Sequence, residues 1–338
     1  MTLEETLEKI HPADETAMEA ALAHWNNIAM PLHSLGRLQD TVVRIAGMTG
    51  NARVDLKKKA LVVMCADNGV VEEGVTQSGQ EVTKIVAENF LKEKATASIL
   101  CKKAGADIFP VDIGIATDST ILQHKVMYGT KNMAKEPAMT REQAVQALEV
   151  GIHMVEELKE KGYGIIATGE MGIGNTTTSS AVTAVLLEQD PAKVTGRGAG
   201  LSGAGLEKKI SVIRDAIALH KPKKEDSIDV LAKVGGLDIA GMAGVFLGGA
   251  ACRIPVVADG FICPAVKDYV ITSHKSKEPA TVMILEALDI PVFLDCDMCL
   301  GEGTGAVTIY PILDMALAVY GGMCTFSDNQ MENYVPLV

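Results

Sequence analysis

The sequence has no surplus of basic residues with which to bind a polyanion. Aspartate and glutamate number 43 against 31 lysines and arginines, which gives a formal net charge of −12. Nucleic acids and anionic membranes attract basic patches, so this balance argues against both as partners. The short basic runs Lys57–Lys59 and Lys221–Lys224 are typical of solvated helix or loop faces. We expect neither a nucleic acid nor a membrane as partner.

Signals for export or membrane insertion are also missing. The first residues, MTLEETLEKI, are acidic and amphipathic, whereas a secretory signal has a basic start followed by an apolar core. The apolar, glycine-rich stretch Ile239–Cys252 is 14 residues long, shorter than the ~20 residues that cross a bilayer. We expect this stretch to form a buried helix and the protein to be cytoplasmic.

No cysteine or histidine pattern indicates a disulfide framework or a metal site. The seven cysteines are odd in number and scattered, so reduced thiols are expected. Cys296 and Cys299 form a lone C-x-x-C, with no second pair and no histidine at ligand spacing. The seven histidines include no H-E-x-x-H motif. We expect no metal and no cofactor.

What the chain does contain is an alternation of short apolar runs and longer helical patterns. The expected buried strands are Ala60–Ala66, Ile108–Ile113, Gly164–Ala167, Ile254–Ala258 and Pro291–Leu294. The helical patterns between them include Glu81–Ala104, Arg141–Lys161, Thr176–Glu188 and Leu206–His220. This alternation predicts an α/β fold with a mostly parallel sheet and flanking helices.

The two ends of the chain differ from its middle. The first 50 residues carry helical patterns at Asp14–Asn27 and Gly36–Gly47, and the last 30 have no clear strand after Thr308–Tyr310. We predict a small helical domain from residues 1–50 and 311–338, beside a large α/β domain over residues 51–310. Ligands of open α/β sheets bind beyond the carboxyl ends of the strands, so the segments that follow the apolar runs carry most information.

Two glycine-rich segments are suited to bind a phosphate. In Gly169–Thr178, GEMGIGNTTT, three glycines expose backbone N–H groups, and Asn175 or Thr176 can cap a following helix. An ordinary strand-to-helix turn explains this segment about equally well, and the lack of a lysine before the threonines excludes a Walker A loop. Val194–Leu201 could close over the same phosphate, with Lys209 supplying a point charge.

A third segment, Leu300–Gly305, places Glu302 between two glycines. The unobstructed backbone suits close approach to a ligand, and partial burial could raise the pKa of Glu302 enough for general-base catalysis. Taken alone, the segment is better explained as a surface turn. Asp295 and Asp297 form a D-x-D like that of metal-dependent sugar-nucleotide transferases, which is an alternative function.

With these loops in view, the chain resembles the nicotinate-nucleotide:dimethylbenzimidazole phosphoribosyltransferases, in order and along nearly its whole length. The segments that carry the resemblance are PLHSLGRLQD (31–40), ADNGVVEEGV (66–75), QEVT (80–83), GEMGIGNTT (169–177), GRGAGL (196–201), GGLDIAGMAG (235–244), VVADGFI (256–262), SHKSKEP (273–279) and LGEGTGA (300–306). The resemblance implies a Rossmann-like sheet, a small helical domain from both chain ends, an identical or homologous partner subunit, and no metal.

The resemblance also assigns roles by position. Glu302 corresponds to the catalytic base and Glu170 to a second acidic residue of the site. The positions that hold the phosphate, or lie near the nicotinate and ribose, are Gly172, Gly174, Asn175, Thr176, Thr177, Gly198, Gly200, Lys209, Ser276, Gly301 and Gly303. Ser78, Gln80 and Met171 are expected in the acceptor pocket. The implied reaction moves the phosphoribosyl group of nicotinate mononucleotide to a lower-ligand acceptor for cobamide assembly, giving an α-riboside 5′-phosphate and nicotinate.

Several positions depart from the usual pattern of that family. Ser78 and Gly79 stand where an aromatic residue and a proline usually precede QEVT, Asn68 stands where histidine is usual, and His33 replaces a glycine; Ala280 is a further departure. Loss of an aromatic wall should weaken the preference for a bicyclic benzimidazole. A smaller acceptor, phenol or p-cresol, is therefore a hypothesis.

Two functions of other kinds remain open. The chain could be a metal-dependent glycosyltransferase that uses Asp295 and Asp297, in which case chelation would abolish its activity. It could instead be a non-catalytic, nucleotide-binding subunit that supports an active homologue. The presence of Glu302 and Glu170 argues against a silent subunit, because such a chain has no need for a carboxylate between two glycines.

Overall fold

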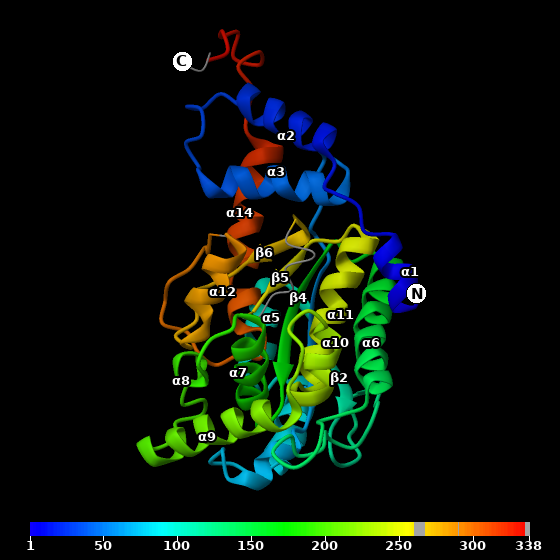
Figure 1. Ribbon diagram of the computed structural model, residues 1–338. Helices are drawn as coiled ribbons and strands as arrows, with labels where there is room; N and C mark the ends of the chain where they lie inside the picture. The colour runs from blue at the N-terminus through cyan, green and yellow to red at the C-terminus, as the bar shows by residue number, and fades with distance from the viewer. Residues whose placement is uncertain (260–267, 290, 335–338) are drawn as a thin grey trace.

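The computed structural model describes residues 1–259, 268–289 and 291–334 and has an α/β fold (Figure 1). Its six-stranded sheet has the order β3-β2-β1-β4-β5-β6, and every neighbouring pair is parallel. The strands are β1 Lys59–Ala66, β2 Ala106–Gly114, β3 Leu122–Gln123, β4 Ile165–Met171, β5 Val256–Ala258 and β6 Val270–Thr272. The predicted α/β fold with a parallel sheet and flanking helices is confirmed.

Helices make up most of the rest of the described chain. They are α1 Leu3–Glu8, α2 Glu15–Asn27, α3 Arg37–Thr49, α4 Glu81–Leu91, α5 Thr96–Ala104, α6 Arg141–Glu160, α7 Asn175–Leu186, α8 Pro191–Val194, α9 Gly203–His220, α10 Ser227–Val234, α11 Leu237–Cys252, α12 Ala280–Leu288, α13 Thr304–Thr308 and α14 Tyr310–Gly322, with a 3₁₀ turn η1 at Gly69–Glu73. Local signals fix several ends. The Thr140 hydroxyl accepts the N–H of Gln143, whose side chain accepts the N–H of Thr140, so a capping box begins α6.

The sheet is covered by helices on both faces. All eight residues of β1 are buried, which explains why its sequence is apolar without alternation. On one face α11 packs against β1, β2 and β4 with α6 outside it, and α4, α5 and α13 cover the other face (Figure 1). A Cβ at Gly151 would lie 2.6 Å from the backbone nitrogen of Val245, so glycine lets α6 and α11 approach closely. The prediction of a buried helix over Ile239–Cys252 is confirmed.

The two ends of the chain meet in a small apolar cluster. Trp25 of α2 and Tyr320 of α14 lie with ring centroids 4.9 Å apart, and Val42 of α3 is buried beside them. The short α1 instead packs on α6 and α11, and the N–H of Leu3 donates to Glu149 at 3.0 Å. The division into 1–50 with 311–338 and 51–310 stays a prediction, and residues 335–338 lie outside the described chain.

Two strand predictions were wrong. Pro291–Leu294 forms only an isolated bridge from Leu294 to His274, because the segment lies beside the sheet, with Pro291 exposed and the other three residues half-buried. Thr308–Tyr310 lies where α13 passes into α14, and Pro311 in the first turn of α14 is compatible with a helix start. The predicted helical stretch 81–104 is two helices, α4 and α5. The segment VVADGFI is described only as far as Asp259.

Within the described residues, one helical run is apolar and long enough to cross a bilayer by length and composition alone. It comprises α13 and α14, Thr304–Gly322. Tyr310 and Leu313 of this run are buried in the main core, and the Tyr310 hydroxyl donates to the carbonyl of Ala60 in β1 at 2.7 Å. The run therefore packs as a core helix that joins the sheet to the cluster at the chain ends.

Candidate active site

Glu302 lies in a left-handed turn that closes against the end of β4. Its φ is +60°, and the flanking Gly301 and Gly303 have φ of +83° and +81°. A left-handed conformation is uncommon for residues other than glycine. A Cβ at Gly169 would lie 2.6 Å from the carbonyl carbon of Glu302, so the turn can pack on β4 only because residue 169 is glycine.

The Glu302 carboxylate is suited to accept a proton. It is half-buried, and Oε2 has no hydrogen-bond partner among the described residues. Burial raises the pKa of Glu302, and the negative charge of Asp259 raises it further, while the backbone N–H of Ala97 at the start of α5 lowers it. A carboxylate with a raised pKa and a free oxygen is a competent general base near neutral pH.

Glu170, near the end of β4, reaches the same turn. The Oε1 atom of Glu170 lies 2.6 Å from the point where a Cβ on Gly301 would stand. Its side chain keeps some contact with solvent, but burial of the carboxyl group raises its pKa well above the usual range, with further increases from Asp259 and Asp238. Glu170 and Glu302 therefore meet at one turn, as two carboxyl groups with raised pKa values.

Asp259, which follows β5, anchors the turn that carries Glu302. Asp259 is buried; its Oδ2 accepts the N–H of Gly303 at 2.9 Å and its Oδ1 accepts the N–H of Ala306 at 3.1 Å. His274, also buried, has its Nδ1 3.5 Å from Oδ1 of Asp259. Sequence reasoning assigned no role to Asp259 or His274, although an acidic residue directly after a buried strand could have signalled one.

Lys209, the start of α7 and the loop before α9 come together as a cradle for an anion. Lys209 of α9 is fully buried, and its Nζ donates to the Thr176 hydroxyl at 2.8 Å and to the Gly196 carbonyl at 3.2 Å. Gly198, with φ of +51°, lies so close that a Cβ on it would be 2.9 Å from Thr176 Oγ1 and 3.6 Å from Lys209 Nζ. We call these three residues, Thr176, Gly198 and Lys209, the cradle.

The cradle contains a cation without an anionic partner. Burial lowers the pKa of Lys209 from 10.5 to about 8, opposed by the negative charge of Glu278. Within the described chain, Lys209 forms no ion pair with a carboxylate. A buried cation is costly unless it is paired, so a bound phosphate would supply the missing charge.

The start of α7 adds backbone donors to the cradle. Gly174, with φ of +94°, precedes the helix, and the N–H groups of Ile173, Asn175 and Thr177 are already bonded to other atoms of the protein. Those of Gly174 and Thr176 have no partner among the described residues. Free N–H groups at a helix start attract anions, in agreement with the expected phosphate loop.

Behind this loop lies a buried polar pair that sequence reasoning missed. Asn68 and Asp238 are fully buried, and Nδ2 of the first and Oδ2 of the second lack partners among the described residues. Both atoms face Gly172, at 3.2 and 2.8 Å from the position that its Cβ would take. Burial raises the pKa of Asp238 to about 7. Asp238 lies in the segment GGLDIAGMAG, but its charge in an apolar helix drew no assignment.

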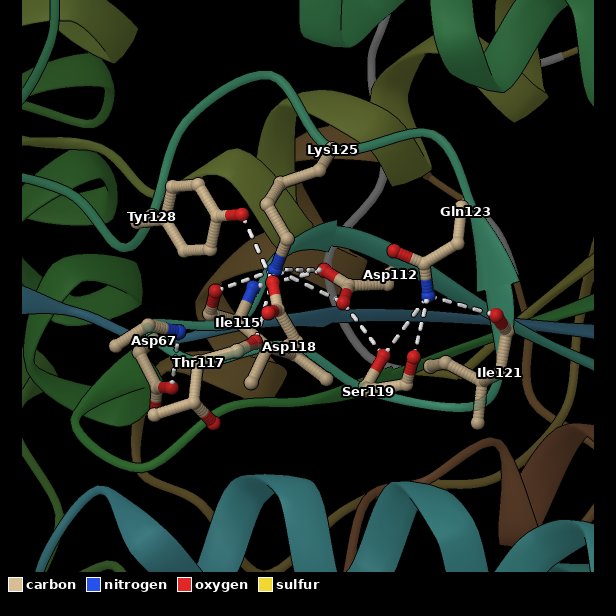
Figure 2. A network of polar contacts seen from close by, with 11 residues as sticks. Asp67, Asp112, Ile115, Thr117, Asp118, Ser119, Ile121, Gln123, Lys125 and Tyr128 are labelled. Atoms are coloured by element: carbon tan, nitrogen blue, oxygen red, sulfur yellow. Dashed lines mark hydrogen bonds and ion pairs between the residues drawn. The ribbon is translucent and has the colours of Figure 1, made fainter.

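The segment after β2 is folded around a buried ion pair, which Figure 2 shows from close by. Lys125 Nζ lies 2.9 Å from both carboxylate oxygens of Asp112, and Asp112 is fully buried. In the loop that this pair holds closed, the N–H of Ala116 donates to Oδ2 of Asp67 at 2.8 Å. The network thus fixes the end of β1. Asn68, whose side chain faces Gly172 of the candidate site, follows shortly after this end.

The predicted acceptor-pocket residues lie on the loop before α4 and at the end of β4. Gln80 donates to the carbonyl of Asn68 at 3.3 Å, and Gln77 donates to the carbonyl of Gly200. The Ser78 carbonyl accepts the Thr76 hydroxyl at 2.8 Å. This loop therefore bridges the end of β1 and the glycine-rich loop at 196–200. Met171, the last residue of β4, is mostly buried.

Ser276 and the D-x-D pair line a cavity of about 250 Å³. Asp295 lies 3.3 Å from Lys275 Nζ and Asp297 lies 3.9 Å from Lys277 Nζ. Both carboxylates are well exposed, and the described residues contain no group of three or more metal-ligating side chains. The neighbouring Cys296 and Cys299 are exposed free thiols. The D-x-D carboxylates are thus paired with lysines.

Comparisons with known proteins cover nearly the whole chain. A family model described as phosphoribosyltransferase matches residues 10–331. The nicotinate-nucleotide–dimethylbenzimidazole phosphoribosyltransferase of Acetivibrio thermocellus is 46% identical over 348 residues and 99% of each chain. The enzyme of the same name from Ruminiclostridium cellulolyticum is 46% identical over 351 residues and all of both chains. The crystal structure of CobT from Thermus thermophilus superposes with a TM-score of 0.88 at 34% identity, covering 94% of this chain and 100% of that one.

Proposed function

This chain belongs to the phosphoribosyltransferase family whose model matches residues 10–331, and we propose that it transfers the phosphoribosyl group of nicotinate mononucleotide to an aromatic acceptor. The products are nicotinate and an α-riboside 5′-phosphate, which serves as the lower-ligand unit of a cobamide. The donor and the acceptor class follow the names of the curated relatives. The arrangement of Glu302, Glu170 and the cradle supports both.

The donor determines which groups the enzyme must supply. The glycosidic bond of nicotinate mononucleotide ends on a cationic pyridinium nitrogen, so the ring departs as a neutral group and needs no general acid. The enzyme must hold the 5′-phosphate, tolerate an oxocarbenium-like ribose and remove the acceptor proton. The acceptor attacks the face opposite the leaving ring, which converts a β-riboside into an α-riboside. The reaction balances without a redox or metal cofactor, and we expect none.

The observation that carries the proposal is the state of the Glu302 carboxylate. Its Oε2 atom is buried and has no partner among the described residues, and burial raises the pKa of the carboxyl group. We assign Glu302 as the base that takes the acceptor proton. Glu170, whose pKa is raised well above its usual range, keeps its own proton more readily. Two adjacent carboxyl groups rarely ionise together, so Glu170 leaves Glu302 as the ionised member of the pair.

The cradle is the proposed site of the 5′-phosphate. Lys209 supplies the charge, Thr176 a hydroxyl, and the N–H groups of Gly174 and Thr176 two further donors. Gly198 keeps the space above Lys209 free of a side chain. We place Ser276, Gly301 and Gly303 near the nicotinate and ribose, as the family resemblance implies.

We propose that the acceptor is dimethylbenzimidazole, a related base, or a smaller ring such as phenol or p-cresol, and the loop before α4 bears on this choice. Residues 78 and 79 are serine and glycine, so this stretch offers a benzimidazole no aromatic wall to stack on. The loop that carries Ser78 and Gln80 is held against the site by Gln77 and Gln80. Glu302 can deprotonate a phenolic hydroxyl as it would a ring N–H, which gives an O-riboside by the same displacement.

The remaining expectations concern the setting of the reaction. We propose that the enzyme acts in the cytoplasm as a dimer with a copy of itself or with a homologous subunit. The acidic net charge of −12 supports small-molecule substrates over nucleic acid or membrane partners.

The test is an assay of nicotinate release by the purified protein with nicotinate mononucleotide and, separately, dimethylbenzimidazole, adenine, phenol or p-cresol. Acceptor-dependent release together with a phosphorylated α-riboside supports the proposal and identifies the acceptor. If the chain is inert with every acceptor, alone and with a co-purified homologous subunit, the proposal fails. Loss of activity on chelation would favour the metal-dependent alternative at Asp295 and Asp297.

A further inference from the structure

Besides the backbone N–H of Ala97, little among the described residues holds the Glu302 side chain, so the backbone decides where the carboxylate stands. Oε2 has no partner among the described residues, and the residues on either side of Glu302 are glycines with positive φ. Such a segment has many accessible conformations unless its peptide groups are fixed. The position of the carboxylate therefore depends on what holds the peptide group that joins Glu302 to Gly303.

That peptide group is clamped from two sides. On one side the Cα of Gly169 lies against it, and a Cβ there would be 2.6 Å from the Glu302 carbonyl carbon and 2.7 Å from the Gly303 nitrogen. On the other side Asp259 Oδ2 accepts the Gly303 N–H at 2.9 Å. Asp259 Oδ1 accepts the N–H of Ala306 at 3.1 Å, so the same carboxylate also caps the start of α13.

Asp259 is in turn oriented by His274 and Ser273. The Ser273 hydroxyl donates its only hydrogen to the Ala258 carbonyl at 2.6 Å, so its oxygen accepts from His274 Nδ1 at 3.0 Å. His274 Nδ1 therefore carries a hydrogen. The same nitrogen lies 3.5 Å from Asp259 Oδ1. A Cβ on Gly305 would overlap His274 Nδ1, so glycine at 305 lets the turn reach this pair.

From this geometry we propose that Asp259 is a positioning residue of the transfer reaction: it holds the Glu302–Gly303 peptide group against β4 and so sets where the Glu302 carboxylate stands. The proposal rests on the proposed function and extends it to a buried residue whose carboxylate oxygens are bonded to the Glu302 turn. Asp259 acts through Glu302, and its effect on turnover disappears once Glu302 can no longer accept a proton.

The test is a double-mutant cycle with Asp259→Asn and Glu302→Gln, measured as kcat and as KM for nicotinate mononucleotide. A displacement of about 1 Å at a reacting group costs up to ~100-fold in rate, so we expect Asp259→Asn to lower kcat roughly 10- to 100-fold with little change in KM. In the Glu302→Gln background, Asp259→Asn should lower the residual kcat by less than about twofold. Gly305→Ala, which displaces the turn from His274, should behave in the same way.

A matched control is Asp226→Asn, because Asp226 also caps a helix, accepting the N–H of Asp229 at 3.1 Å at the start of α10. It should leave kcat unchanged. If Asp259→Asn and Glu302→Gln lose activity independently, so that their effects multiply, Asp259 serves the fold alone and the proposal is overturned.

A second measurement separates this proposal from the proposed function. Hydrogen exchange of the Gly303 and Ala306 amides should accelerate more than about tenfold in Asp259→Asn, while the amides of β1 stay protected. Unchanged exchange at Gly303 and Ala306 would contradict the clamp whether or not the enzyme turns over. A wild type that is inert with every acceptor, but shows accelerated exchange in the variant, would refute the transferase and leave the clamp standing.

Discussion

The Glu302 peptide group lies directly on Gly169: a Cβ at position 169 would stand 2.6 Å from the Glu302 carbonyl carbon. Two segments far apart in the sequence, GEMGIGNTT and LGEGTGA, therefore meet at one peptide group. The contact places the candidate base beside Glu170 and at the end of the strand that leads into the glycine-rich loop before α7.

Replacing Gly169 with alanine should displace the Glu302 turn. We expect Gly169→Ala to lower kcat by up to ~100-fold, because the added methyl group cannot be accommodated without moving the base. The matched control is Gly321→Ala in α14, where a Cβ meets nothing within 4 Å. Alanine favours a helix by about 1 kcal/mol over glycine, so the control should be as stable as wild type or more so, and fully active. Equal activity of the two variants would contradict the contact.

Removing the buried cation should weaken binding of the donor through its phosphate. We expect Lys209→Met to raise KM for nicotinate mononucleotide about 100-fold, a loss of ~2–3 kcal/mol typical of a charge-assisted hydrogen bond to a phosphate. Turnover of nicotinate riboside, which has no phosphate, should not change. Lys208→Met, on the exposed face of the same helix, is the control. A loss that is equal for both substrates would place Lys209 outside the phosphate site.

The lowered pKa of Lys209 predicts a pH dependence of donor binding. Burial brings this pKa to about 8 in the free enzyme, so the ammonium group is protonated below pH 8 and loses its charge above it. Because the phosphate binds the charged form, KM for nicotinate mononucleotide should rise as the pH increases through about 8. The dependence should be absent in Lys209→Met. A KM that is flat from pH 7 to 9 in the wild type would contradict the assignment.

The acceptor hypothesis predicts a reversal of preference on restoring an aromatic wall. Ser78→Phe should lower kcat/KM for p-cresol and raise it for dimethylbenzimidazole, shifting the ratio about tenfold, since an aromatic contact is worth ~0.5–1.5 kcal/mol. Ser211→Phe on the exposed face of α9 is the control and should leave the ratio unchanged. If wild type already prefers dimethylbenzimidazole, the hypothesis of a small acceptor is wrong.

The sequence predicts the centre of this fold better than its edge. β1, β4 and α11 are largely buried, and the apolar residues that fill most of their length predict them. β6 has three residues and β3 has two, too few for a pattern. Pro291–Leu294 has the composition of a strand, but hydrogen bonding beside His274 decides its conformation, and that contact cannot be read from spacing.

Predictions of the site depended on which residues the fold brings together. The glycine-rich loops and Glu302 were visible as motifs, whereas the approach of Gly198, Thr176 and Lys209 is a tertiary contact that no single loop specifies. Asp259 and Asp238 were missed because buried acids in apolar segments resemble interruptions of a pattern. His33, which replaces a glycine of the family pattern, has a left-handed conformation, with φ of +56°.

The removal of the acceptor proton by Glu302 is the central step of the proposed mechanism. Its most direct test is acceptor-dependent nicotinate release by wild type, Glu302→Gln and the control Glu286→Gln, which changes an exposed glutamate of α12. General-base catalysis contributes roughly 10²–10⁴-fold, so Glu302→Gln should lose that much in kcat at an unchanged melting temperature, while Glu286→Gln keeps wild-type activity. A Glu302→Gln enzyme within about twofold of wild type would show that another group removes the proton.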